Sequence, residues 1–216
     1  MMLELYGHPF SSYTWKALIA LYASETPFAF RMLGPDEPEN GARVAAASPL
    51  GKFPLLIDGD AEVFEATSII EHLWLHYPGA AHLLPADPVR AAHVRMIDRV
   101  FDNYVMGPMQ AVVDEHLPGG GMDPARIAKA RANLERTYVW LERWLENYTP
   151  GEDISLIECA AAPSLFYADW VLPIPASYPR LAAYRAYLLA LSPVARCVED
   201  ARPYRPFFPL GAPDRD

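Results

Sequence analysis

The order of secondary-structure signals in the first third of the chain constrains the fold more than any other feature. Apolar residues 3–6 predict a short strand, which Gly7 and Pro9 end, and residues 12–22 then carry apolar side chains at helical spacing. A second strand is predicted at 28–33, where apolar residues resume. Short strands and helices in alternation indicate an α/β domain.

A long loop and a hairpin are expected next. Residues 34–51 are rich in turn-forming residues and are predicted to form a loop with one helical turn. "DGD" at 58–60 separates the apolar stretches "PLLI" and "AEVF", which predicts a two-residue turn between antiparallel strands. A helix is expected over 67–76. Since Pro54 precedes the hairpin, the whole order is that of a thioredoxin-like domain.

The rest of the chain predicts an all-helical domain. Residues 78–88 are rich in Pro, Gly, Ala and Asp, which is typical of a connection between domains. We therefore interpret 79–87 as a linker between an N-terminal domain, 1–78, and a helical domain, 88–216.

Capping residues mark helix boundaries in the helical domain. One helix should start at Pro88 and be interrupted at Gly107–Pro108, because Pro108 lacks the backbone N–H that its turn requires. Ser155 followed by Glu158 three residues later forms the pattern of a capping box. A further helix is therefore expected to begin at this point.

Composition excludes several classes of function. The chain has 18 Lys and Arg against 27 Asp and Glu, a formal charge of −9, so nucleic acid is not an expected partner. No apolar run reaches the roughly 18 residues of a membrane span, and a cytoplasmic protein without membrane contact is expected. Cys159 lies in an apolar run and should be buried. His72 and His76 lack a third ligand nearby, so no metal site is predicted.

The turn between the first strand and the first helix is the candidate site. A helix N-terminus carries unpaired N–H groups, and its macrodipole stabilises a thiolate placed there. Redox members of the thioredoxin-like fold have Cys-x-x-Cys in this place, whereas here it holds Ser11, Ser12, Tyr13 and Thr14. Without those sulfurs the chain cannot run dithiol exchange from its own groups. The pattern suggests that the reactive sulfur comes from a ligand.

Five blocks, in order along the chain, make the sequence similar to cytosolic-type glutathione transferases. They are "SSYTWK", "SPLGKFPLLIDG", "VFEATSIIEHL", "ISLIECAAAPSLFYADW" and "RPYRPFFPL". The first resembles the serine-type block of the zeta and related classes, and the last resembles a tail found in bacterial members. The resemblance implies the glutathione transferase fold, an α/β thioredoxin-like N-terminal domain plus an all-α C-terminal domain. It also implies glutathione as co-substrate, no metal, and a homodimer that serves in detoxification.

The resemblance further implies roles for individual residues. Ser11 would face the glutathione sulfur as the catalytic residue, with Ser12 and Tyr6 as alternative hydroxyl donors. The expected glutathione-binding residues are Lys52 beside the glycyl carboxylate, Phe53 before a cis Pro54 at the cysteinyl part, and Glu65 with Ala66 at the γ-glutamyl end. Most members have Ser at the place of Ala66. The missing hydrogen bond should weaken glutathione binding by about 1 kcal/mol.

A hydrophobic electrophile is expected to bind between the two domains, where aromatic rings and Met thioethers suit an apolar substrate. Its predicted lining consists of Phe10, Tyr104, Met106, Met109, Phe166, Tyr167 and Trp170. Conjugation of glutathione to such an electrophile is the first hypothesis. Glutathione-dependent isomerisation is an alternative, although an acidic substrate would then need cationic residues in the pocket. A non-catalytic binding or interaction module that retains the fold is another, and Ala66 favours it.

Overall fold

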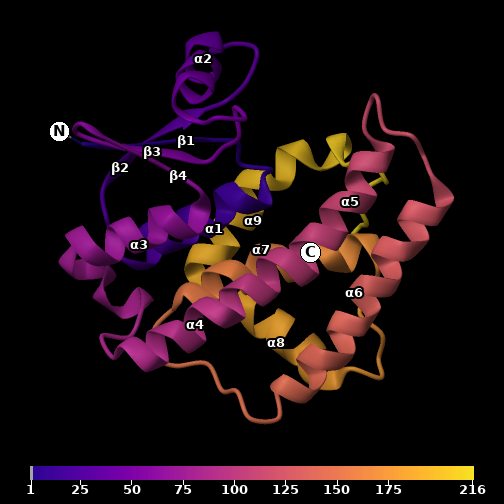
Figure 1. Ribbon diagram of the computed structural model, residues 1–216. Coiled ribbons are helices and arrows are strands. Elements are labelled where there is room, and N and C mark those ends of the chain that lie inside the picture. The colour runs from indigo at the N-terminus through magenta and orange to yellow at the C-terminus, as the bar shows by residue number, and fades with distance from the viewer. Residues whose placement is uncertain (1) are drawn as a thin grey trace.

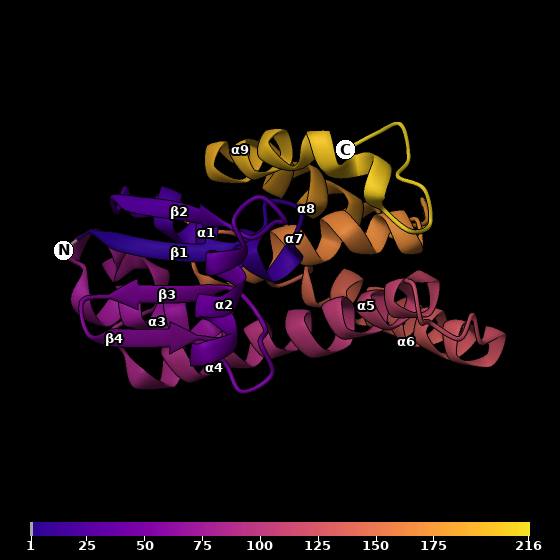
Figure 2. The ribbon, with the colours of Figure 1, turned by 90° about the horizontal axis from the view of Figure 1, so that it is seen from above.

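A four-stranded mixed sheet forms the centre of the N-terminal half. The computed structural model describes residues 2–216. The strands are β1 (Leu3–Gly7), β2 (Phe28–Met32), β3 (Leu55–Asp58) and β4 (Ala61–Phe64), and Figure 2 shows them side by side in the order β2-β1-β3-β4. β1 pairs in parallel with β2 and antiparallel with β3. This mixed sheet confirms the predicted α/β class.

The predicted hairpin is also confirmed. Asp58 at the end of β3 pairs with Ala61 at the start of β4, so Gly59 and Asp60 form a two-residue turn. Gly59 has φ +60°, a left-handed conformation that glycine adopts without steric cost.

Three helices cover the sheet. α1 (Ser12–Ala23) and α3 (Ala66–His76) pack against each other on one side, and α2 (Pro38–Ala47) lies on the other, as Figure 1 shows. α1 and α3 lie where their apolar spacing predicts them. β1 leads directly into α1, so the candidate site is held between a buried strand and a buried helix.

α2 is longer than the one helical turn predicted for residues 34–51, so that prediction is wrong. Pro38 occupies the first turn, where no backbone N–H is needed, and the alanines at the end of the helix favour helical structure. Val44 is only 2% exposed and packs with Tyr6 and Leu55. Burial of this side chain on the sheet stabilises a helix that the local turn-forming residues do not indicate.

The rest of the chain is helical. Residues 79–87, predicted as a linker, include most of a 3-10 helix, Pro78–Leu83. The helices that follow are α4 (Pro88–Val100), α5 (Gly107–His116), α6 (Pro124–Trp144), α7 (Leu156–Val171), α8 (Pro179–Ala190) and α9 (Ser192–Ala201), with a 3-10 helix at Arg202–Phe207. The main apolar core runs through both halves, from Leu3 to Phe208, and a smaller cluster of Tyr6, Val44 and Leu55 lies under α2. The division into two domains at 79–87 stays a prediction.

The predicted interruption at Gly107–Pro108 is wrong. The helix continues from α4 into α5 through a π-helical segment, Phe101–Met106. The Gly107 N–H donates to the carbonyl of Asp102, five residues earlier. A regular helix would bring the Pro108 ring against the carbonyl four residues before it, and the wider π turn relieves that clash.

α7 is the central helix of the helical half, and all 16 of its residues are buried. Its predicted capping box is confirmed: the Ile157 N–H donates to Ser155 Oγ at 3.2 Å, and the Ser155 N–H donates to Glu158 Oε2 at 3.0 Å. Cys159 is fully buried, as predicted, and burial raises the pKa of its thiol. This cysteine is therefore a packing residue.

Within residues 2–216, none of the helices combines the length and apolarity that crossing a bilayer requires. The cytoplasmic location expected from the sequence stays a prediction.

A buried charge network joins α1 to α3 and α4. Lys16 of α1 is fully buried, and its Nζ lies 2.5 Å from Asp98 Oδ1 and 2.8 Å from Asp102 Oδ2. The same ammonium group donates to Thr67 Oγ1 of α3 at 2.8 Å. Arg99 pairs with both carboxylates, at 2.5 and 2.6 Å. Two cations thus balance two anions where the halves of the molecule meet.

Replacing Lys16 with Met should destabilise the protein strongly. The change leaves the carboxylates of Asp98 and Asp102 buried with only Arg99 opposite them, and removing one partner of a buried ion pair costs about 3–5 kcal/mol. Urea unfolding measures the effect. Arg95→Met is the control, since the Arg95 and Glu71 side chains of that pair are 39% and 34% exposed, and its effect should stay within about 1 kcal/mol. Equal losses in both variants would contradict a special role for the network.

Candidate active site

A set of hydrogen bonds holds the turn between β1 and α1. The Ser11 N–H donates to the carbonyl of His8 at 2.9 Å, and the Phe10 N–H donates to His8 Nδ1 at 3.1 Å. The Trp15 indole N–H donates to the carbonyl of Pro9 at 2.6 Å, which ties the turn to the buried face of α1. The position of Ser11 is therefore set by the backbone and by its neighbours.

Ser11 is the N-cap residue of α1, and its Oγ accepts a hydrogen bond from the Thr14 N–H at 3.3 Å. Because the hydroxyl oxygen is the acceptor in this bond, the hydroxyl proton remains free to be donated elsewhere. A group bound at this helix end would also meet the positive end of the helix dipole. Capping the helix and binding an anion are thus compatible roles for one side chain.

Ser11 opens onto a pocket of about 280 Å³ between the two halves of the molecule. The lining residues are Phe10, Ser11, Ser12, Tyr13, Phe53, Met109, Gln110, Val113, Leu117, Tyr167, Phe207, Phe208 and Pro209. None of these side chains carries a formal charge at neutral pH. The pocket therefore suits an uncharged, largely apolar group next to the Ser11 hydroxyl.

Among the residues predicted for the electrophile pocket, the structure brings Phe10, Met109 and Tyr167 to this cavity. The Tyr167 hydroxyl is already engaged, since it donates to the carbonyl of Phe10 at 2.9 Å. Tyr167 thus holds α7 against the turn, and the proton of its hydroxyl is used in that contact.

The other predicted lining residues do not reach the pocket. Met106 and Phe166 are 0% and 1% exposed and belong to the core, and Trp170 is also buried. Tyr104 is 59% exposed and lines a different groove, between α4 and α6. Helical spacing alone does not separate these positions from those facing the cavity.

Several residues that line the pocket are not predicted from the sequence. They are Tyr13, Gln110, Val113, Leu117, Phe207, Phe208 and Pro209. The two adjacent phenylalanines of "RPYRPFFPL" indicate a segment that packs on another part of the molecule, because large apolar side chains are stabilised by burial. Tyr13 lies within the "SSYTWK" block, and burial raises the pKa of its phenol to about 12. Tyr13 is therefore a neutral phenol in the lining of the pocket.

The two alternative hydroxyl donors lie in different surroundings. Ser12 lines the pocket and is 6% exposed. Tyr6 is turned away from it: the hydroxyl donates to Glu4 Oε2 at 3.1 Å, and the ring packs with Val44 and Leu55. Tyr6 is thus not brought to the cavity.

The loop before β3 has the predicted backbone geometry. The Phe53–Pro54 peptide bond is cis, as the resemblance implies. Phe53 is 37% exposed and lines the pocket, so its backbone lies beside the space in front of Ser11. Lys52 is exposed, and its backbone N–H donates to Ser48 Oγ at 3.1 Å.

The start of α3 presents backbone N–H groups, but its first residue, Ala66, carries no hydroxyl. Glu65 precedes the helix at φ +68°, and its side chain makes no capping bond. Ala66 is 4% exposed. The Thr67 hydroxyl accepts from Lys16 and donates to Asp98 Oδ2 at 3.1 Å, so it is committed to the buried charge network. Thr67 therefore cannot replace the serine hydroxyl that family members place at position 66.

His72 lies 2.9 Å from Asp58 Oδ2 through its Nε2, and its ring is 4.5 Å from that of His76. The hydrogen bond from His72 is the main reason that the pKa of Asp58 is lowered. Within residues 2–216, no group of three potential ligands is arranged to hold a metal ion. His72 therefore anchors the hairpin to α3.

Comparison with protein families places this geometry in a known class. Residues 5–81 match the family model described as "Glutathione S-transferase, N-terminal domain". A glutathione S-transferase of Pseudomonas putida is 29% identical over 73% of this chain and 70% of its own length. The GST-like protein YibF of Escherichia coli is 27% identical over 78% and 83%.

Solved structures agree with these matches. A glutathione S-transferase from Methylobacillus flagellatus, crystallised with glutathione bound, superposes with a TM-score of 0.75 at 26% identity, over 90% of this chain and 98% of that one. One from Methylobacterium radiotolerans, in complex with glutathione sulfonate, has the same score at 25% identity, over 92% and 95%. The chain is thus similar to glutathione S-transferases over most of its length, and its residues 5–81 match the N-terminal domain of that family.

Ala66→Ser should strengthen glutathione binding. The new hydroxyl would stand at the N-terminus of α3, where Thr67 is engaged elsewhere, and one added hydrogen bond of about 1 kcal/mol corresponds to a roughly fivefold lower KM for glutathione. Steady-state kinetics at fixed electrophile measures this. Ser68→Ala in the same helix turn is the control. An unchanged KM in Ala66→Ser would contradict the proposed place of the γ-glutamyl carboxylate.

Changes at His8 should alter the acid stability of the turn. His8 accepts the Phe10 N–H only while Nδ1 is unprotonated, and burial lowers the pKa of His8. The contribution of this hydrogen bond to the free energy of unfolding is therefore fully present above the ordinary pKa of histidine. It is lost as the pH falls through the lowered pKa of His8. His8→Asn supplies an acceptor two residues before the N–H without titrating, so it should keep Tm near neutral pH and show a smaller acid decline.

His8→Phe is the matched control, because it keeps a ring against Tyr204, whose centroid is 4.6 Å away, but removes the acceptor. It should lower Tm by a few degrees at neutral and acidic pH alike. Thermal unfolding at about pH 7 and about pH 5 separates the three proteins. The same acid decline in wild type and His8→Asn would show that the Nδ1 bond is not responsible.

Proposed function

We propose that this protein conjugates the thiolate of glutathione to an uncharged, hydrophobic electrophile. One observation carries the proposal: the Ser11 hydroxyl, which caps α1 as an acceptor and keeps its proton for a ligand, lines a cavity whose lining residues carry no formal charge. Such an arrangement stabilises one anion, the sulfur, beside a site for an apolar partner.

Ser11 would act by stabilising the thiolate. A hydrogen bond to a charged acceptor contributes about 1.5–3 kcal/mol, which is roughly one to two units of thiol pKa. The thiol proton passes to solvent, the sulfur attacks the electrophilic carbon, and the leaving group departs with the electron pair of its bond. The serine forms no covalent bond in this scheme.

The remaining parts of glutathione would lie along the loop and helix that border Ser11. The backbone of Phe53 would pair with the cysteinyl part, and Lys52 would attract the glycyl carboxylate. At the other end, Glu65 would pair with the α-ammonium group, and the N–H groups at the start of α3 would bind the α-carboxylate. The family match over residues 5–81 supports this placement.

Glutathione-dependent isomerisation is the weaker alternative. A probable maleylacetoacetate isomerase of Caenorhabditis elegans is 23% identical over 76% of this chain. A dicarboxylate would need cationic partners, and the 13 residues lining the pocket include no Lys or Arg. For a non-catalytic module, Ala66 is the favouring feature. Calorimetry with millimolar glutathione distinguishes the two hypotheses: the absence of binding would support the non-catalytic module, and binding would support the enzyme.

Ser11→Ala tests the proposal. With a chromogenic aryl halide as electrophile, kcat/KM should fall about 10- to 100-fold, in proportion to the lost charge-assisted hydrogen bond. The pKa of bound glutathione, followed by thiolate absorbance, should rise with it. Ser12→Ala, at the neighbouring pocket-lining serine, is the control and should change the rate less than about threefold. Equal rates for Ser11→Ala and wild type would remove Ser11 from the mechanism.

We also infer a homodimer, which the family resemblance implies. Met96, Tyr104 and Trp140 are 51%, 59% and 42% exposed and line a groove of about 640 Å³ along α4 and α6. A second copy covering this groove would remove the exposed apolar surface from water. Light scattering should give the mass of two chains, and Trp140→Glu should give one. Met122→Glu, exposed but outside the groove, should leave the mass unchanged.

A further inference from the structure

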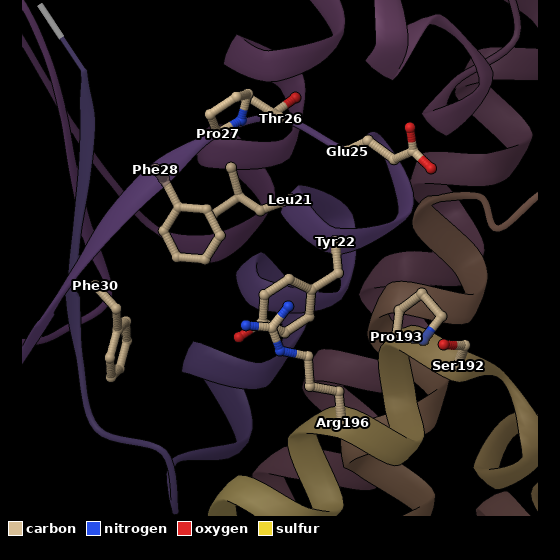
Figure 3. A pocket seen from close by; sticks show the side chains of 10 residues that line it. All are labelled: Leu21, Tyr22, Glu25, Thr26, Pro27, Phe28, Phe30, Ser192, Pro193 and Arg196. Carbon is tan, nitrogen blue, oxygen red and sulfur yellow. The ribbon is translucent and has the colours of Figure 1, made fainter.

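A second hollow lies at the opposite end of α1 from Ser11 (Figure 3). It has a volume of about 500 Å³ and is lined by Leu21, Tyr22, Glu25, Thr26, Pro27, Phe28, Phe30, Ser192, Pro193 and Arg196. It shares no residue with the candidate active site. α1 has 12 residues, so at 1.5 Å per residue the two places are roughly 18 Å apart.

Arg196 is the feature that distinguishes this hollow. Its guanidinium carbon lies 4.0 Å from the centroid of the Tyr22 ring, which is a stacking distance. Within the described part of the chain, Arg196 forms no ion pair and no side-chain hydrogen bond. Stacking on Tyr22 orients the guanidinium plane and leaves its N–H edge unused. Arg196 is therefore held ready for a ligand with two oxygen acceptors.

Tyr22 adds a second donor. Burial raises the pKa of its phenol to about 12, so the hydroxyl is protonated at neutral pH. Figure 3 shows this hydroxyl beside the guanidinium of Arg196, on the side that faces Phe30. Glu25, the acidic residue of the lining, points its carboxylate away from the two phenylalanine rings. The donors thus lie on the aromatic side of the hollow.

Aromatic rings stand across the hollow from these donors. Phe28 and Phe30 belong to β2, an edge strand of the sheet, and both rings are half-buried. The Phe28 ring packs against the Tyr22 ring, with centroids 5.7 Å apart, and Figure 3 shows Phe30 standing apart from Tyr22 and Arg196 across the hollow. An aliphatic acid lacks the aromatic pairing that these rings offer to an aromatic ligand. The volume is within the range of small-molecule sites, and a small inorganic anion would not fill it.

We propose that this hollow binds a small planar aromatic carboxylate. The carboxylate accepts from the Arg196 guanidinium and the Tyr22 hydroxyl, and the ring lies against Phe28 and Phe30. The proposal is independent of the proposed glutathione chemistry, because the two sites share no residue and lie at opposite ends of α1.

The test uses 2-naphthoate as the probe, titrated calorimetrically into the full chain, with S-hexylglutathione present in excess to fill the candidate active site. Wild type should bind one equivalent per chain. Arg196→Gln should weaken binding at least tenfold, Arg196→Lys by less, and Tyr22→Phe about threefold, because the ring remains. Arg131→Gln is the matched control, since Arg131 is an exposed arginine outside this hollow, and it should bind like wild type.

Two further probes test the chemical class. Cyclohexanecarboxylate lacks the aromatic ring and 2-naphthol lacks the carboxylate, and each should bind at least tenfold more weakly than 2-naphthoate. Absence of 2-naphthoate binding at millimolar concentration would overturn the proposal. So would equal affinity in Arg196→Gln, provided that its thermal unfolding matches wild type. Loss of transferase activity in Ser11→Ala with naphthoate binding retained would keep the two sites distinct.

Discussion

The buried ammonium group of Lys16 is the contact on which the rest of this structure depends. It joins α1 to Thr67 of α3, to Asp98 of α4 and to Asp102 of the π-helical segment, at distances of 2.5 to 2.8 Å. Apolar packing alone would let these helices slide, whereas charges out of water require their partners in place. The network therefore fixes the orientation of α1, and the N-terminus of α1 presents Ser11 to the pocket.

The same network limits the chemistry of the site. The Thr67 hydroxyl is bound to Lys16 and Asp98 and Ala66 has none, so at these two positions α3 offers a ligand only backbone N–H groups. A residue beside the active site is thus committed to joining the two halves. Burial raises the pKa of Asp102, while Lys16 opposes that rise. The affinity for glutathione thus depends on Ala66, and the stability of the helix junction depends on the adjacent Thr67.

The apolar character of the pocket comes from the aromatic side chains that line it. Phe208, Phe10 and Tyr167 form a cluster of rings with centroids 5.6 to 6.5 Å apart, and all three line the pocket that Ser11 opens onto. An anion bound at Ser11 would lie in low-dielectric surroundings, where a single hydroxyl and a helix end act strongly. An acidic second substrate would find no counter-ion among these residues.

Local sequence determined most of the elements and the reactive position. Gly7 and Pro9 end β1, "DGD" makes the hairpin, Ser155 and Glu158 cap α7, and Ser11 caps α1, because each signal acts within a few residues. Tertiary structure decided the pocket walls. α7 is buried on every side, so its periodicity cannot tell that Phe166 faces the core and Tyr167 the cavity. The π turn before Pro108 and the placement of Phe208 over Phe10 depend on contacts between segments far apart in the chain, which no local pattern records.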